Sequence, residues 1–346
     1  MMRCGRFHYH APRTLRDACA MLQDAGSDGM LLAGGTDLVP NMKRRQQTPK
    51  VVISLRHVAG LRDAGPDGNR VRLGAMLTLS DLTAKEEVRA RHTALFKAAA
   101  QVATPHLRNM GTLGGNLCLD TRCNYYDQNY EWRKAINFCM KKAGEICWVA
   151  PSSRRCWAIS STDTAPALIA LGAEVALATR DGERTLCVAD FCRDDGIQYL
   201  TRNPDEILTQ VLLPIPAPGE SSTYWKLRRR GSFDFPVLSV AAWIRRPPEG
   251  RVEAARLVLG SVASRPVIAE AAAGLVGTTL SEDVIEAVAE EASRLAKPLD
   301  NTDFSLGWRK KAARYLITGA LRELRGDDPQ TLGPLARRAA ELAPVG

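Results

Sequence analysis

Hydrophobic and polar residues follow two different periods along the first part of the chain. Over residues 14–25 the apolar positions recur every three or four residues, and Asp17 lies three residues after a possible N-cap at Thr14. This spacing predicts a short amphipathic helix. Short apolar runs at 30–33 and 51–55 predict buried strands instead. The chain therefore begins with a small α/β unit.

A second α/β pattern starts near residue 70. The spacing predicts a strand over 71–73, a helix over 78–83 and a longer helix over 87–102. A glycine-rich loop at 108–116 comes next.

Regular periodicity fails between Cys118 and Cys156, where Tyr, Trp, Lys, Arg and Cys are frequent. This segment, about 118–160, has the pattern of an insertion into a regular domain. Periodicity returns at Asp163 with a short helix over 165–171, and an Asp-Gly pair at 181–182 predicts a hairpin.

A proline-rich stretch at 211–219 marks the predicted boundary between two domains. Beyond it, strands are expected at 223–229, 237–244 and 252–262, and helices near 267–275, 282–295 and 306–324. Strands followed by helices are typical of an α+β domain. We therefore expect an α+β protein with a first domain over 1–219, built of two α/β subdomains, and a second over 220–346, an antiparallel sheet with helices.

Composition fits a globular protein of this size. A chain of 346 residues exceeds what one hydrophobic core usually supports, which agrees with several subdomains. The net charge of +9 suits an anionic partner, but the basic residues are scattered and not gathered into a stripe with aromatics. Nucleic acid is therefore disfavoured, and a phosphate-bearing cofactor or an acidic subunit explains the charge as well.

The cysteine content bears on the compartment and the chemistry. The chain begins without an apolar signal region and has no 18-residue apolar run, so we expect a cytoplasmic protein without membrane contact. In that reducing compartment nine cysteines favour metal or redox chemistry over disulfides.

Two glycine-rich loops form the first candidate site. The loop at 33–37 follows a predicted strand, where free backbone N–H groups and glycines can bind a phosphate. Alone, a Gly-Gly pair is more often a tight turn. A second loop at 111–116 adds further donors, and two loops suit a pyrophosphate. Neither matches the Rossmann or the P-loop pattern, so both of those folds are disfavoured.

These loops and two later blocks, in this order, resemble a known family. Residues 31–38 and 107–117 look like the two FAD loops of the flavin subunits in the xanthine dehydrogenase and carbon monoxide dehydrogenase family. Residues 163–173 and 224–236 resemble later blocks of the same subunits. The resemblance covers nearly the whole chain and implies a PCMH-type FAD-binding domain followed by a C-terminal domain like that of the carbon monoxide dehydrogenase flavoprotein.

The resemblance also implies which residues bind the cofactor. They are Leu31, Leu32, Ala33, Gly34, Gly35, Thr36, Asp37, Leu38, His106, Thr112, Gly114, Gly115, Asn116, Asp163 and Lys226. Asp163 would reach ribityl or ribose hydroxyls, and Lys226 would lie near the flavin, where a cation stabilises the anionic reduced form. A structural role for His106 is about as well supported, and outside this motif Lys226 would be taken for an exposed strand lysine.

Four cysteines in the insertion form the second candidate site. Cys123, Cys139, Cys147 and Cys156 follow the spacing C-x15-C-x7-C-x8-C. Four thiolates can bind an iron–sulfur cluster or a zinc ion. The absence of a close cysteine pair favours a [4Fe-4S] cluster, while free buried cysteines remain an alternative. Nearby basic residues that would offset the cluster charge are Arg122, Arg133, Lys134, Lys141, Lys142, Arg154 and Arg155. Cys118 continues the flavin loop and is not assigned as a ligand.

A flavin subunit with a four-cysteine loop at this place resembles the beta subunits of the 4-hydroxybenzoyl-CoA reductase branch. That resemblance implies that Cys123, Cys139, Cys147 and Cys156 hold a [4Fe-4S] cluster. It further implies electron flow from ferredoxin through the cluster and FAD to a small [2Fe-2S] subunit and a large molybdenum-cofactor subunit, in a dimer of heterotrimers. The net reaction would be reductive dehydroxylation to benzoyl-CoA.

Two alternatives remain open at this point. The chain could be the FAD subunit of another molybdenum hydroxylase, acting on xanthine, carbon monoxide or an aldehyde. It could also be a non-catalytic scaffold whose four cysteines bind structural zinc. We expect no catalytic residue on this chain, because the five histidines are scattered and no nucleophile–base constellation is present.

Overall fold

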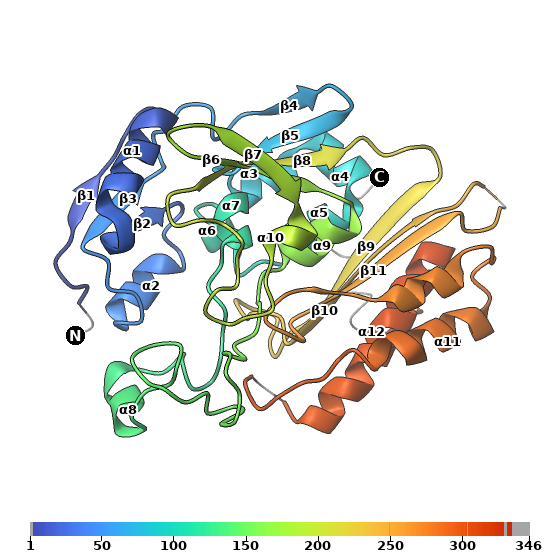
Figure 1. The fold of residues 1–346 in the computed structure, drawn as a ribbon. Helices are drawn as coiled ribbons and strands as arrows, with labels where there is room; N and C mark the ends of the chain where they lie inside the picture. The colour runs from blue at the N-terminus through green and yellow to red at the C-terminus, as the bar shows by residue number, and fades with distance from the viewer. Residues whose placement is uncertain (1–2, 249, 303, 329–330, 334–346) are drawn as a thin grey trace.

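The structure is a computed structural model that describes residues 3–248, 250–302, 304–328 and 331–333. The last residues of the predicted second domain, 334–346, lie outside the described residues. The described chain is α+β, with three sheets and helices packed against them (Figure 1).

The first unit is a parallel sheet with strand order β1-β3-β2. The predicted helix forms here, because the Thr14 side chain accepts a hydrogen bond from the Asp17 N–H and thus caps it. The elements are β1 (His8–His10), α1 (Leu15–Ala25), the 3-10 helix η1 (Gly26–Asp28), β2 (Gly29–Leu32), α2 (Leu38–Lys43) and β3 (Val51–Ser54).

The second unit is an antiparallel sheet with strand order β4-β5-β8-β6-β7. Its strands come from both sides of the insertion, so the sheet brings the two ends of the insertion near each other. The elements are β4 (Ala64–Asp67), β5 (Arg70–Gly74), α3 (Leu79–Ala84), α4 (Glu86–Arg91), α5 (Thr93–Ala100), α6 (Pro105–Arg108), α7 (Leu113–Leu117), α9 (Thr164–Ala170), β6 (Glu174–Ala178), β7 (Glu183–Cys187), α10 (Val188–Phe191) and β8 (Ile207–Pro214).

The helix predicted over 87–102 is wrong in its extent. Two helices, α4 and α5, occupy this stretch, and His92 between them has a non-helical backbone (φ −124°, ψ 55°). The reason is a tertiary contact, since the Ala94 N–H donates to Ser222 Oγ at 3.1 Å and is not used for a continuous helix.

The C-terminal unit is an antiparallel sheet with strand order β12-β11-β10-β9 and helices on one face. The elements are β9 (Glu220–Leu227), β10 (Leu238–Arg245), β11 (Ala254–Gly260), β12 (Val267–Ile268), the 3-10 helix η2 (Glu270–Leu275), α11 (Glu282–Ser293) and α12 (Leu306–Arg325). The helix predicted near 267–275 is wrong at its start, because the β-branched Val267 and Ile268 pair with β11 as an edge strand. None of the described helices has the length and apolar character that crossing a bilayer requires.

Helices α5 and α9 lie between the second and the C-terminal sheets. Their apolar residues share one core with strands β6 and β8 on one side and with Tyr224 and Ala241 on the other. A separate core holds α11 and α12 against the C-terminal sheet. This shared packing fixes the two sheets relative to each other, so that residues from both can line one cavity.

The insertion between α7 and α9 forms a lobe beyond α2 (Figure 1). Within it, α8 (Tyr130–Ala135) is the helix, and the rest consists of turns and isolated bridges. One bridge pairs Arg122 with Ile159 and joins the two ends of the lobe.

Candidate functional site

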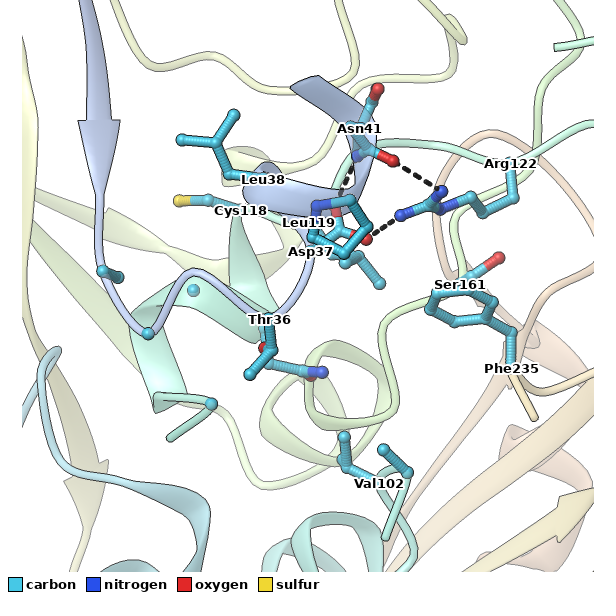
Figure 2. Close-up of a pocket in the computed structure, with 18 of the residues that line it drawn as sticks. Thr36, Asp37, Leu38, Asn41, Val102, Cys118, Leu119, Arg122, Ser161 and Phe235 are labelled. Carbon is cyan, nitrogen blue, oxygen red and sulfur yellow. Dashed lines mark hydrogen bonds and ion pairs between the residues drawn. The ribbon is translucent and has the colours of Figure 1, made fainter. Parts of the chain in front are cut away.

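A cavity of about 770 Å³ lies between the two glycine loops, the start of α9 and the C-terminal unit (Figure 2). Of the predicted cofactor residues, those that line it are Leu31, Ala33, Gly34, Gly35, Thr36, Asp37, Leu38, Thr112, Gly114, Gly115, Asn116 and Asp163. Loops nearly 80 residues apart in the sequence therefore meet at one cavity. Its volume is within the range of cofactor sites.

The first loop meets the second at a glycine. A Cβ on Gly34 would lie 1.9 Å from the Met110 carbonyl oxygen, so only glycine allows this approach. Gly35 has a positive φ of 75°, which also favours glycine. Within the described chain the backbone N–H groups of Gly34, Gly35 and Thr36 have no hydrogen-bond partner. These donors at the cavity wall suit an anionic group such as a pyrophosphate.

The second loop is held by bonds of its own. Thr112 caps α7 by accepting from the Gly115 N–H at 3.0 Å, and the Gly114 N–H donates to the Ala75 carbonyl at 2.8 Å. The Asn116 side-chain oxygen accepts from the hydroxyl groups of Thr162 and Thr164. This loop therefore contributes shape to the cavity, and the N–H groups of its two adjacent glycines are already used.

Asp163 is buried at the start of α9 and lines the cavity. It accepts from the Tyr224 hydroxyl at 2.7 Å and forms an ion pair with Lys226 at 3.0 Å. Burial raises the pKa of Asp163 and lowers that of Lys226, and each partner's charge opposes the shift of the other. The pair fixes the carboxylate in place at the cavity wall.

Three predicted residues do not line this cavity. Lys226 lies behind Asp163, where its ammonium also donates to the Gln101 carbonyl at 3.0 Å. His106 is exposed on α6, and Leu32 ends β2 without reaching the cavity wall. Lys226 thus acts on the cavity through Asp163.

Several lining residues were not found from the sequence. Tyr199 and Asn301 reach the cavity from distant parts of the chain and had no local signal. Phe233 and Phe235 stood in a motif that the family resemblance identified, yet no role was assigned to them. The basic character of Arg122 was noted, but not its contacts with the flavin loop.

Arg122 connects the insertion to the first flavin loop. Its guanidinium forms an ion pair with Asp37 and donates to Asn41 Oδ1 at 3.3 Å and Asp127 Oδ1 at 3.0 Å. Figure 2 shows it pointing at Asp37 and Asn41. The guanidinium carbon lies 4.7 Å from the centre of the Phe235 ring.

All four predicted cysteine ligands line one small cavity and are buried. Burial raises the pKa of the Cys123 thiol to about 12, and the Ala158 N–H donates to Cys156 Sγ at 3.4 Å. A hydrogen bond with the Cys156 thiol lowers the pKa of Cys147 to about 5. N–H donors directed at cysteine sulfur are favourable for thiolates that bind a metal centre.

The donor set of this cavity fits a thiolate-bound metal centre. Its free volume is about 10 Å³, so a cluster would require the four side chains to rotate outwards. Among the described residues no three His, Cys, Asp or Glu side chains are arranged to hold a single ion. Lys141 is buried at the same cavity, with its ammonium 2.8 Å from Asp120 Oδ1, and supplies positive charge there.

The comparison with protein families decides the identity of the larger site. The model of the FAD-binding domain in molybdopterin dehydrogenases matches residues 5–216. The chain belongs to this family. The model of the carbon monoxide dehydrogenase flavoprotein C-terminal domain matches residues 222–324. The chain is therefore an FAD-binding oxidoreductase subunit of the molybdenum hydroxylase family, with the α+β fold predicted from the sequence.

Individual relatives agree with this assignment. The medium chain of the carbon monoxide dehydrogenase of Afipia carboxidovorans is 28% identical, over 93% of this chain and 97% of the relative. The FAD-binding subunit of the Escherichia coli aldehyde oxidoreductase is 34% identical, over 70% of this chain and 77% of the relative. The solved carbon monoxide dehydrogenase of Oligotropha carboxidovorans superposes with a TM-score of 0.78 at 26% identity, covering 94% of this chain and all of that one.

Proposed function

We propose that this flavin subunit transfers electrons within a molybdenum-dependent complex and that its four-cysteine segment binds a [4Fe-4S] cluster as an additional redox centre. One observation carries the proposal: Cys123 lines both the flavin cavity and the small cavity formed by the four cysteines. Two cavities that share a wall suit two centres that exchange electrons. FAD supplies the exchange between one-electron and two-electron partners.

Different residues of the large cavity would bind different parts of FAD. The free N–H groups of residues 34–36 would bind the pyrophosphate, and the second loop would shape the wall against which it lies. Asp163, fixed by Tyr224 and Lys226, would accept from hydroxyl groups of the cofactor. Both partners lie on strand β9. The position of the Asp163 carboxylate is therefore fixed before the cofactor binds.

The small cavity would hold the cluster through Cys123, Cys139, Cys147 and Cys156. Lys141 would offset part of the negative charge of a thiolate-bound cluster, since its ammonium is buried against the same cavity. The zinc alternative keeps the same ligands but gives the segment no redox role.

Two reactions are possible for the whole complex. Named relatives are carbon monoxide, aldehyde and nicotinate dehydrogenases or oxidoreductases, which supports an oxidative molybdenum hydroxylase. The four-cysteine segment supports the other reading, a 4-hydroxybenzoyl-CoA reductase that receives electrons from ferredoxin. In both readings the partners are a large molybdenum-cofactor subunit and a small [2Fe-2S] subunit, as the term medium chain in the relatives' names suggests.

Anaerobic purification of the chain tests the cluster directly. We expect one FAD, four iron atoms and four sulfides per chain, with a cubane EPR signal after reduction. Cys147→Ser should lose the iron and keep FAD, whereas Cys187→Ser, at an exposed strand position, should keep both. Zinc in place of iron, without an EPR signal, would contradict the cluster.

The reaction is tested on the complex with its partner subunits. Reduction of 4-hydroxybenzoyl-CoA by a reduced viologen would establish the reductase. Oxidation of an aldehyde, carbon monoxide or an N-heterocycle with a dye acceptor, without dehydroxylation of the thioester, would establish the hydroxylase.

A further inference from the structure

The first flavin loop, residues 31–38, and the cysteine segment, residues 118–160, are joined by a set of polar contacts. We call the contacts between residues 37–47 and residues 120–133 the brace. The first range contains Asp37, α2 and the turn after it, and the second contains the start of the cysteine segment. A displacement of residues 37–47 would therefore also displace residues 120–133, and the reverse.

Arg122 is the centre of the brace. Its side chain is 6% exposed, and it pairs with Asp37 of the flavin loop and with Asp127 of the cysteine segment at once. Asn41 completes the set, because it accepts from Arg122 and donates to Asp37 at 2.9 Å. Asp37 and Arg122 also line the FAD cavity. One guanidinium thus holds the end of the flavin loop to the start of the cysteine segment.

Further contacts run parallel to this pair. The Gln46 side chain donates to the Tyr126 carbonyl at 2.6 Å, and the Gln47 side chain donates to Asp120 at 3.1 Å. The buried Arg133 of α8 donates to the carbonyls of residues 44 and 45. Such contacts are strong because most of these groups are shielded from water.

The geometry of the brace depends on the cysteine segment being ordered. The Arg122 backbone pairs with Ile159 through two hydrogen bonds of 2.8 Å, and Cys123 follows directly. The segment's own core consists of Cys123, Tyr126, Cys139, Cys156 and Ala158. This core is small for some 40 residues, so a cross-link through the four thiolates would add to the order that contacts with the rest of the chain provide.

We propose that metal binding by the cysteine segment and FAD binding are linked through Arg122. A metal centre on the four thiolates fixes Arg122 against Asp37, which holds the first flavin loop in the geometry that binds FAD. By reciprocity, bound FAD makes the metal harder to remove. The inference rests on the proposed function only in requiring that the four cysteines bind a metal centre.

The test compares FAD affinity in two states of the same full-length chain. FAD is removed from metal-loaded protein and from protein stripped of metal by a chelator under anaerobic conditions, and each is titrated with FAD by flavin fluorescence. We expect metal removal to raise the Kd for FAD about tenfold, within the usual range of coupling between sites. The rate of iron loss to the chelator should fall when FAD is bound.

Variants assign the linkage to Arg122. In Arg122→Gln the metal-loaded and metal-free forms should bind FAD with Kd values within about twofold of each other, and both more weakly than the loaded wild type. Arg184→Gln is the matched control, because Arg184 of the second sheet pairs with Glu206 and neither residue lines either cavity. It should keep the tenfold difference.

Equal FAD affinity in the loaded and stripped wild-type protein would overturn the linkage, whether or not any variant folds. If Arg122→Gln fails to fold, Asp127→Asn removes one partner and should reduce the difference between the two states. Metal analysis of the loaded protein separates the two proposals: iron with no linkage defeats this inference alone, whereas zinc with linkage defeats the cluster alone.

Discussion

The flavin cavity and the cysteine segment share a wall at Cys123, yet they are stabilised in different ways. The flavin cavity lies among strands and helices whose apolar residues form large cores. The cysteine segment has one short helix and a core of five buried residues. The comparison teaches that the fold determines the shape of the first site, whereas the second has few structural contacts of its own, and there the proposed metal centre would contribute most.

Positive φ values at non-glycine residues cluster in the cysteine segment, whereas Ala103 has the one found in the lining of the flavin cavity (φ 48°). Asn137, Phe138 and Ala143 of the cysteine segment have positive φ values of 57–69°. Each such residue costs about 1 kcal/mol or more relative to ordinary backbone. The segment around Cys139 is therefore strained as well as thinly packed, which increases its dependence on a cross-link.

Removal of one thiolate should give the largest effect, with the increase of hydrogen exchange confined to the cysteine segment. In Cys139→Ser we expect loss of the metal and an increase of amide hydrogen exchange over 118–160 by orders of magnitude, because the segment loses its cross-link. Strands of the second sheet should keep their protection. Unchanged exchange over 118–160 would show that the segment is ordered by its own contacts.

On the flavin side, the buried Asp163–Lys226 pair is the most sensitive point. Lys226→Met leaves the Asp163 charge buried and should lower the free energy of unfolding by about 3–5 kcal/mol, measured by urea denaturation. Lys50→Met breaks an exposed pair with Asp28 and serves as the control, with an expected change below about 1 kcal/mol. A small effect of Lys226→Met would mean that Asp163 is protonated in the folded protein.

Gly34→Ala tests the close contact between Gly34 of the first flavin loop and Met110 of the second. The added Cβ would collide with the Met110 carbonyl, so the loops must separate, at a cost of about 1–3 kcal/mol in stability and with weaker FAD binding. Gly182→Ala, where a Cβ meets nothing within 4 Å, is the matched control. Thermal unfolding and flavin content measure both effects.

The smallest expected effect is a pH dependence of the stability. It arises at His92, in the well-packed part of the chain that contains the flavin cavity. Burial, with a smaller contribution from Arg91, lowers the pKa of His92 to about 4. Because the unfolded state binds this proton more readily, stability is complete above about pH 6.5 and is lost as the pH falls towards 4.

Between pH 7 and pH 5 the contribution of His92 to this loss should be about 2 kcal/mol. His92→Gln should flatten the profile by that amount in urea titrations at the two pH values. An unchanged slope would show that His92 is not the group responsible.

The sequence predicted those parts of the molecule that depend on local signals. Thr14 and Asp17 marked the start of α1, and glycines marked both flavin loops. Contacts between distant residues could not be read from it: Ser222 interrupts the helix predicted over 87–102, and Arg122 pairs with Asp37 across 85 residues. Lys226 was placed near the cofactor by its motif, but its position behind Asp163 depends on the packing of β9 against α9.

The lining of the flavin cavity runs from Met30 to Thr302, whereas all four cysteines of the smaller site lie before residue 157. Synthesis on the ribosome proceeds from the N-terminus, and segments fold as they emerge. The cysteine segment is thus complete in the nascent chain when the flavin cavity still lacks the wall formed by residues 229–237. The proposed metal centre could therefore be inserted during translation, whereas FAD can be enclosed only after almost the whole polypeptide has left the ribosome.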